Sequence, residues 1–246
     1  MAGVWPEERV GLPLMAQRWR AVTFLHWPLE PAVVQALLPD GLVVDTFDGA
    51  AWVSLTPFAI ERARPLLVPP VPRVSTFPET NLRTYVVGPD GRDGLWFFTL
   101  EADSAATVTG AMPLGLPYRW AAMELQRDAQ RISYRSRRRR TPKIGHRIVV
   151  EPSRHPVAED DARCAWLTGR WRAWTRVGPR FAAFPAEHER WNLVHATVVT
   201  LEENLSVAAG LPRLGDEPLV HFSAGVSARL GWPRLVPVGA VASRRT

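Results

Sequence analysis

The chain is anchored by an irregular apolar segment, Gly110-Ala111-Met112-Pro113-Leu114-Gly115-Leu116-Pro117-Tyr118-Arg119-Trp120-Ala121. Proline removes a backbone donor and glycine favours positive φ, so no regular strand or helix is expected to run through this segment. Solvated loops are rarely so apolar. We therefore expect a buried kink that holds Tyr118 and Arg119 in fixed positions. The alternative is a packed connection between two strands, with Arg119 reaching solvent.

Composition limits the classes of protein to which the chain can belong. It has 246 residues, of which 46% are hydrophobic, enough for one large domain or two small ones. The formal net charge is +6, and Lys143 is the only lysine. Cys164 is the only cysteine, so an internal disulfide and a cysteine zinc cluster are both excluded.

The N-terminal residues do not have the pattern of a signal peptide. The most apolar runs, residues 66–71 and 235–242, are short and contain proline, well below the roughly 20 residues of a membrane span. We expect a cytoplasmic protein without a membrane segment.

Alternating apolar and polar residues predict a chain made mostly of strands. They are expected at residues 17–25, 42–47, 51–58, 81–87, 95–102, 131–139, 147–151, 169–177, 180–184, 191–200 and 221–230. His26-Trp27-Pro28 should end the first strand, and Asp48-Gly49 should form a tight hairpin. Short helices are expected at residues 31–38, 160–167 and 202–209, and the proline-rich run 65–72 should be a loop.

Strand follows strand too often for a doubly wound α/β fold. We expect an α+β chain, mostly β, in which antiparallel sheet closes or stacks and short helices lie at the periphery. There is no fixed-period repeat and no low-complexity linker, so residues 1–246 are expected to form a single domain.

The clearest predicted hairpin joins residues 81–87 to 95–102, and its head is polar. In Phe77-Pro78-Glu79-Thr80-Asn81-Leu82-Arg83-Thr84-Tyr85, every second side chain from Glu79 to Tyr85 should project to one face. We interpret Glu79, Asn81 and Arg83 as a polar patch inside a pocket. The alternative is that Glu79 and Arg83 form only an ordinary ion pair.

Basic residues concentrate in one further segment: Arg135, Arg137, Arg138, Arg139, Arg140, Lys143 and Arg147. Such a patch can bind phosphates, but no recognition helix, zinc finger or aromatic RNA-binding motif accompanies it. A solvated hairpin edge is favoured, which disfavours nucleic acid and leaves anion or membrane-surface attraction open.

Metal and cofactor chemistry has little support in the sequence. The six histidines form no His-Glu-x-x-His pattern, and Glu187, His188, Glu189 and His195 match no metal-binding spacing. Phosphate-loop, Gly-x-Gly-x-x-Gly and Gly-x-Ser-x-Gly motifs do not occur. We therefore expect neither a metal nor a cofactor. Most tryptophans should lie in the core, with Trp96 among those that contact a ligand.

Short motifs along the chain form a recognisable combination. They are Arg18-Trp19 with His26-Trp27, Asp45-x-Phe47-Asp48-Gly49-x-x-Trp52, Phe77-x-Glu79-x-Asn81-x-Arg83-x-Tyr85, Gly94-x-Trp96-Phe97-Phe98-x-Leu100, Leu116-Pro117-Tyr118, Leu167-Thr168-x-Arg170 and Val220-His221-Phe222-Ser223-x-Gly225-Val226. Over about residues 17–237 they resemble the YqjF-like family of unknown function. That family is grouped with acetoacetate decarboxylase-like proteins, which implies a barrel or cone of mostly antiparallel strands around a pocket.

The anchor segment supports that resemblance and limits the chemistry it implies. Gly110, Gly115, Pro117 and Ala121 are in register with the decarboxylase pattern Gly-Arg-Glu-Ile-Trp-Gly-Tyr-Pro-Lys-Lys-Leu-Ala. Phe77-Pro78-Glu79 resembles that family's Tyr-x-Glu, whose carboxylate belongs to the active site. The two family lysines, of which the first forms the Schiff base, are replaced by Tyr118 and Arg119, and a phenol cannot form an imine. The fold and the pocket are therefore expected without Schiff-base decarboxylation.

Together these observations predict a small-molecule pocket in a decarboxylase-like barrel. The candidate catalytic residues are Glu79 and Tyr118, and the candidate ligand contacts are Arg83, Arg119, Trp96 and Asn81. An arginine would hold a carboxylate, and a lyase, hydratase or isomerase acting on an oxo acid fits better than a hydrolase. Two alternatives stay open, a non-catalytic ligand-binding or sensor protein and nucleic-acid association through the basic segment. Whether the protein is an enzyme, which ligand it takes and whether it forms a homo-oligomer are not specified by the sequence.

Overall fold

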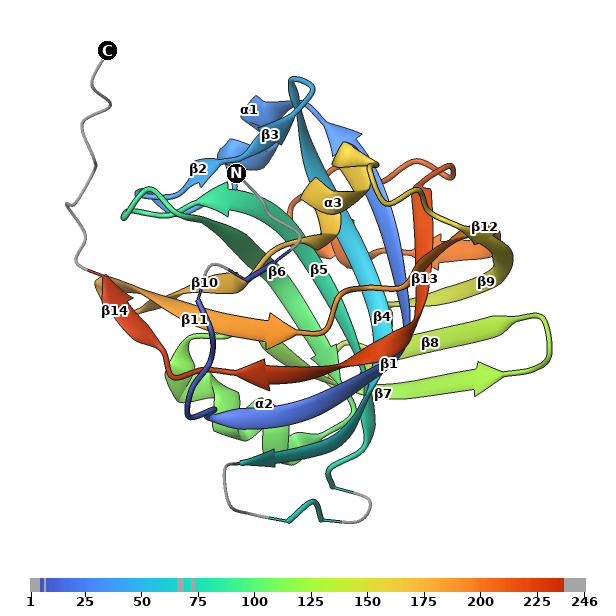
Figure 1. The fold of residues 1–246 in the computed structure, drawn as a ribbon, viewed down its shortest axis with the longest axis horizontal. Helices are drawn as coiled ribbons and strands as arrows, with labels where there is room; N and C mark the ends of the chain where they lie inside the picture. Colours follow the sequence, from blue (N-terminus) through green and yellow to red (C-terminus); the bar gives the residue numbers. More distant parts are fainter. Residues whose placement is uncertain (1–4, 7, 66–68, 72–73, 237–246) are drawn as a thin grey trace.

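Every predicted strand is present in the computed structural model, which describes residues 5–6, 8–65, 69–71 and 74–236 (Figure 1). The described residues hold fourteen strands in one sheet. They are β1 (Met15–Leu29), β2 (Val43–Val44), β3 (Thr46–Phe47), β4 (Ala50–Pro65), β5 (Phe77–Val87), β6 (Asp93–Ala102), β7 (Tyr118–Arg127), β8 (Ile132–Arg138), β9 (Gly145–Pro156), β10 (Arg172–Val177), β11 (Arg180–His188), β12 (Leu193–Glu203), β13 (Leu219–Leu230) and β14 (Arg234–Val236).

The helices are short and lie outside the sheet, as expected. They are α1 (Pro31–Gln35), α2 (Ala105–Ala111), the 3-10 helix η1 (Met112–Leu114), α3 (Ala162–Thr168) and α4 (Leu205–Ala208). The side chain of Asp161 caps α3 by accepting a hydrogen bond from the Cys164 amide at 2.8 Å. Across the described ranges, no helix has the length and apolar character that crossing a bilayer requires.

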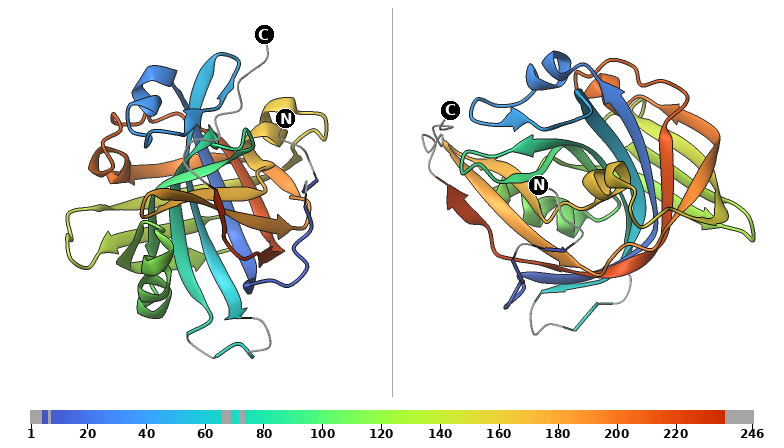
Figure 2. Two further views of the ribbon diagram at one scale, coloured as in Figure 1. Left: turned by 90° about the vertical axis from the view of Figure 1, so that its left-hand side faces the viewer. Right: turned by 45° about the horizontal axis from the view of Figure 1, so that its top comes forward.

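Hydrogen-bonded strand pairs connect the sheet into two rings that share β13, β1, β4, β5 and β6. One ring continues from β6 through β7, β8, β9 and β12 back to β13. The other continues from β6 through β10 and β11 back to β13. The pairs β6–β7 and β6–β10 are parallel, whereas the other pairs in both rings are antiparallel. Figure 2 shows the strands curving around a centre, with β8, β9 and β12 set to one side.

The ring through β7, β8, β9 and β12 is packed with apolar side chains, and we call it the filled ring. Its core takes side chains from β1, β4, β5, β8, β9 and β13 and is closed at one end by α1 and α4. Its fully buried members include Leu25, Leu55, Leu82, Ile148, Val150 and Leu205. Because strand side chains alternate between faces, the other face of the shared strands points into the second ring.

The anchor segment is a packed connection rather than the predicted buried kink. Helix α2 runs through Gly110, η1 follows it, and β7 begins at Tyr118. Met112 is 67% exposed and Trp120 is 45% exposed, so the apolar character of the segment lies largely at the surface. A Cβ at Gly115 would come within 2.1 Å of the Arg176 carbonyl oxygen, which explains the need for glycine where this connection packs on β10.

Several strand boundaries also differ from the prediction. His26-Trp27-Pro28 does not end β1, because that part of the strand still pairs with β4, and Pro28 lies opposite Trp52. Helix α2 was not predicted, since its small and β-branched residues show no helical stripe. Residues 66–68 of the first apolar run and 237–242 of the second lie outside the described residues, as do residues 66–68 and 72 of the predicted loop 65–72.

Candidate functional site

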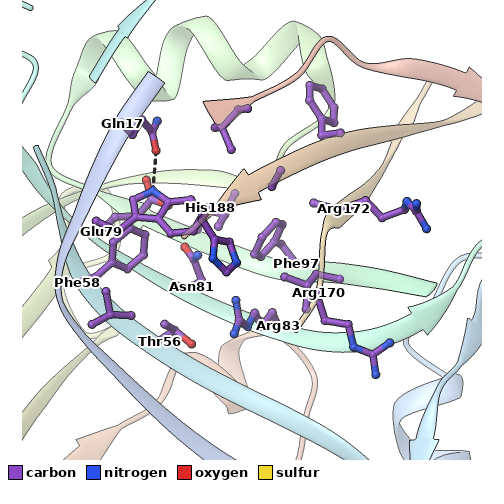
Figure 3. A pocket seen from close by; sticks show the side chains of 18 of the residues that line it. Gln17, Thr56, Phe58, Glu79, Asn81, Arg83, Phe97, Arg170, Arg172 and His188 are labelled. Carbon is purple, nitrogen blue, oxygen red and sulfur yellow. Dashed lines mark hydrogen bonds between the residues drawn. The ribbon is translucent and has the colours of Figure 1, made fainter. Parts of the chain in front are cut away.

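The second ring, formed by β13, β1, β4, β5, β6, β10 and β11, encloses a cavity of about 150 Å³, and we call it the hollow ring. Aromatic side chains from several strands and from the connection before β12 line it: Trp19, Phe24, Phe58, Phe97, Phe184 and Trp191. An engineered protein cavity of similar volume holds benzene, so the space suits a ligand of roughly six to eight heavy atoms. Figure 3 shows the polar side chains that project into the same space.

Strand β5 supplies the polar side chains by simple alternation. Glu79, Asn81 and Arg83 line the cavity, while Thr80 and Leu82 face the filled ring. There the Thr80 hydroxyl hydrogen-bonds to Nε2 of His146 at 2.9 Å. One strand therefore carries the predicted polar patch on one face and core residues on the other, as the sequence pattern indicated.

Glu79 is 4% exposed, and its partner is a phenol. The Tyr118 hydroxyl donates a hydrogen bond to Oε2 of Glu79 at 3.0 Å. Burial raises the pKa of Glu79 to about 8, and the hydrogen bond from Tyr118 opposes this only in part. The carboxyl group is therefore mostly protonated at neutral pH and can donate a hydrogen bond to a ligand. Burial and the neighbouring Glu79 both raise the pKa of Tyr118 well above its usual value.

Tyr118 reaches Glu79 because β7 starts at this residue, directly beside β6. Tyr118 pairs with Leu100 in the parallel ladder between β6 and β7. The prediction that the anchor segment gives Tyr118 a fixed position therefore agrees with the fold, although the segment itself is exposed. Leu116, two residues earlier, also lines the cavity.

Arg83 is 9% exposed and forms no ion pair with any carboxylate in the described part of the chain. Its Nε atom is buried without a hydrogen-bond partner among these residues, and its Cζ lies 5.4 Å from the centre of the Phe24 ring. Burial lowers the pKa of Arg83, an effect that Tyr85 partly offsets. The alternative prediction of a Glu79–Arg83 ion pair is therefore wrong, since Glu79 pairs with Tyr118 instead.

Three further polar atoms of the cavity lining are buried without partners in the residues that the structure describes. They are the amide oxygen of Asn81, the hydroxyl of Thr56 and Nη2 of Arg170, whose Nη1 is already paired. Buried polar atoms in proteins nearly always have a hydrogen-bond partner, so each exception needs an explanation. A bound polar molecule would satisfy these atoms together with Nε of Arg83.

Two predicted ligand contacts lie away from the cavity. Arg119 is exposed, because it follows Tyr118 on β7 and therefore points to the opposite face. Trp96 packs against a separate cluster with Val86 and Trp174, while its neighbours Leu95 and Phe97 line the cavity. The prediction that Arg119 and Trp96 contact the ligand is corrected accordingly.

His188 lines the cavity but was not among the predicted site residues. It is the last residue of β11, and its ring centre lies 4.4 Å from that of Trp171, 4.7 Å from that of Trp191 and 5.6 Å from that of Trp19. Burial is the main cause that lowers its pKa to about 4. The two-residue alternation of Phe184, Ala186 and His188 along β11 would have identified it, but the predicted strand ended at residue 184.

Two other buried charged groups are already paired. Arg170, at the edge of the cavity, donates hydrogen bonds to carboxylate oxygens of Asp45 and Asp93, each at 2.7 Å. Arg138, from the basic segment, donates to the buried Glu101 at 2.8 Å. These pairs satisfy charges that would otherwise be costly to bury, so we assign them a structural role.

The rest of the basic segment is partly neutralised by neighbouring acids. Arg139 lies 3.1 Å from Asp103, and Arg147 lies 3.6 Å from Glu202. Arg135 and Arg137 are exposed on β8, as a solvated hairpin edge requires. Within the described ranges, no group of three or more His, Cys, Asp or Glu side chains is arranged to hold a metal ion.

The closed sheet, its short peripheral helices and the cavity define an acetoacetate decarboxylase-like fold. The structure is similar to acetoacetate decarboxylase from Legionella pneumophila, with a TM-score of 0.65, 12% identity, and coverage of 94% of this chain and 92% of that one. It is also similar to the enduracididine biosynthesis enzyme MppR in complex with pyruvate, with a TM-score of 0.66, 14% identity and 94% coverage of both chains. At these identities the similarity extends to the fold alone.

Sequence comparison places the chain more narrowly. The model of the DUF2071 family, described as an uncharacterized conserved protein, matches residues 16–227. The chain is 33% identical over 225 residues to the uncharacterized protein YqjF of Bacillus subtilis. The aligned region covers 91% of this chain and 92% of that protein. The protein belongs to the DUF2071 family, in agreement with the resemblance found in the sequence.

Proposed function

We propose that the hollow ring binds a small carboxylate-bearing molecule. The observation that carries this proposal is the guanidinium of Arg83, which is buried in the cavity and has no carboxylate partner among the described residues. A buried charge of this kind is costly unless something compensates it. A carboxylate ligand would provide the missing charge and accept hydrogen bonds from the guanidinium.

The other groups of the cavity determine which further chemical groups the ligand carries and how large it can be. The protonated carboxyl group of Glu79 donates a hydrogen bond to a carbonyl or hydroxyl oxygen, and Tyr118 holds Glu79 in place. The aromatic walls accept an apolar part, and the volume of about 150 Å³ limits the molecule to a short-chain acid of roughly six to eight heavy atoms. Small 2-oxo acids meet all of these requirements.

The reaction class follows from which groups are present at the site. Tyr118 stands where the decarboxylase pattern has its Schiff-base lysine, so the ligand is bound without an imine. Glu79 acts as a proton donor, which fits lyase, hydratase or isomerase chemistry on an oxo acid. The similarly folded MppR is known in complex with pyruvate, which supports pyruvate as a first probe.

Isothermal titration calorimetry with pyruvate and 2-oxobutanoate tests the proposal. The Arg83→Gln variant should lose roughly 10- to 100-fold in affinity, the value of a charge-assisted hydrogen bond. Arg119→Gln removes the same charge outside the cavity and should change affinity by less than about twofold. Equal losses in both variants, or no binding of any probe to the wild type, would contradict the proposal.

A turnover assay with any acid that binds separates catalysis from simple binding. Recovery of the bound acid unchanged after long incubation would favour the alternative of a non-catalytic ligand-binding or sensor protein. Nucleic-acid association through the basic segment Arg135–Arg147 stays a prediction, and retention on a heparin column is the assay for it.

A further inference from the structure

His188 lines both the inner cavity and a second, outer cavity. Its side chain projects into the inner space on the side of Asn81 and Arg83 (Figure 3). The outer cavity, about 560 Å³, lies between α3 and the start of β12, and it shares Thr168, His188 and Trp191 with the inner one. The imidazole can therefore contact a ligand on one side and exchange protons with water on the other.

The hydrogen bond at Nδ1 fixes the tautomer of His188. Nδ1 lies 2.6 Å from the backbone carbonyl oxygen of Glu189, which can only accept, so Nδ1 carries the hydrogen. Nε2 then presents a lone pair, and it has no hydrogen-bond partner among the described residues. The His188 ring stacks on Trp171 and packs at a tilt against Trp191, and these contacts hold it in this orientation.

A bound carboxylate would increase the proton affinity of His188. Burial is the largest cause that lowers the pKa of His188, and the positive charge of Arg83 lowers it further. An anion held on Arg83 cancels the effect of the Arg83 charge on the pKa of His188, so the imidazole becomes a stronger base once the ligand is bound. Ligand binding and proton acceptance are in this way coupled through one guanidinium.

We propose that His188 is the proton acceptor of this cavity and Glu79 its proton donor, and that together they interconvert the keto and enol forms of a small 2-oxo acid. The inference rests on the proposed function, because Arg83 must first hold the carboxylate. Nε2 of His188 takes a proton from the carbon next to the carbonyl. The C–H electron pair forms the new carbon–carbon double bond, and the carbonyl oxygen takes the proton of Glu79. Reversal of the step returns a proton to carbon, and no oxidant or reductant is required.

Other charged and titratable groups contribute to the electrostatics of the two sites. Around Glu79 they are Tyr118 and Arg83, and around the inner cavity as a whole they include Arg170 and Arg172. Around His188 they are Arg83 and Glu189, with Glu159, Asp161 and Arg190 in the outer cavity. We expect exchange to increase as His188 loses its proton and to decrease above about pH 8 as Glu79 loses its own.

Deuterium exchange into the methyl group of pyruvate, followed by proton NMR in heavy water, is the test. The wild type should accelerate the exchange, and His188→Asn should lower the exchange rate by about 100-fold or more. The affinity of this variant for pyruvate, measured by calorimetry, should stay within a few-fold of the wild-type value. His188→Phe retains ring stacking and should show the same loss, and Glu79→Gln should also slow exchange. His195→Asn, an exposed histidine on β12, is the matched control and should exchange like the wild type.

The possible results distinguish the two proposals. Wild-type protein that binds pyruvate without accelerating exchange would overturn the acid–base assignment and leave the binding proposal standing. Unchanged exchange in both His188 variants would remove His188 from the reaction. The absence of pyruvate binding by the wild type would overturn the proposed function and this inference with it. Circular dichroism of each variant identifies any loss of fold.

Discussion

The filled ring and the hollow ring share five strands, but a buried carboxylate of the first and a buried guanidinium of the second differ in whether they have a charged partner. In the filled ring, Glu101 is fully buried and accepts hydrogen bonds from the guanidinium of Arg138. In the hollow ring, Arg83 has no such carboxylate among the described residues, and Glu79 has only the phenol of Tyr118. The difference shows that burial alone does not separate structural from functional charges. Structural and functional charges differ instead in whether a partner within the protein compensates them.

The largest expected effect comes from breaking the compensated pair. Arg138→Met leaves the carboxylate of Glu101 buried without its partner and should lower the free energy of unfolding by about 3–5 kcal/mol. Arg83→Met instead removes a charge that has no carboxylate partner among the described residues, and it should be neutral or slightly stabilising. Urea denaturation of both variants measures the difference, and equal destabilisation would show that the two rings do not differ in this way.

A slightly smaller effect concerns the pH dependence of stability. The pKa of Glu79 is about 8 in the folded protein against an ordinary 4.5, so folding favours its protonated form. The stability that Glu79 contributes is therefore complete below about pH 4.5 and is lost as the pH rises to about 8. Glu79→Gln does not titrate, so the stability of the wild type relative to this variant should fall by on the order of 4 kcal/mol over that range.

Urea denaturation at several pH values measures this difference directly. Glu202→Gln, on the exposed edge of β12, serves as the matched control and should follow the wild type at every pH. A constant difference between wild type and Glu79→Gln from pH 4.5 to 8 would mean that the carboxyl group is not held in its protonated form.

The smallest expected effect isolates the single hydrogen bond to Glu79. This bond lowers the pKa of the carboxyl group, so Tyr118→Phe should raise that pKa further, by a little under one unit for a bond worth about 1 kcal/mol. Titration of the variant by carboxyl-carbon NMR measures the shift. A downward shift would mean that Tyr118 does not stabilise the ionised form of Glu79.

The sequence predicted much of the fold, and the shared face of the candidate site residues on β5, because both depend on alternation within strands. Glu79, Asn81 and Arg83 share a face of β5 as the two-residue period requires. The same rule would have excluded Arg119 from the ligand contacts. Pro117 and Gly115, however, gave no sign in the sequence that a strand begins at Tyr118. Contacts between distant strands, such as those from Tyr118 to Glu79 and from Arg138 to Glu101, leave no local pattern in the sequence.

Two other misses have local physical causes. The pairing of β5 with β6 shifts register between Leu82 and Arg83, so that Phe97 lies opposite Arg83. Because of this irregularity, the alternation of side chains along β6 could not be used to predict the face on which Trp96 lies. In β11, Pro185 suggested the end of a strand, yet this residue pairs with Arg172 and the strand continues to His188. Residues beyond such irregularities can be assigned only from the pairing itself.

The most direct test of the central claim is the titration of the Glu79 carboxyl group by carbon-13 NMR, with the resonance assigned through Glu79→Gln. A midpoint near pH 8 in the free protein, moving upward when saturating pyruvate places a second negative charge in the cavity, is the result that the account predicts. A midpoint near pH 4.5 that pyruvate leaves unchanged would contradict it.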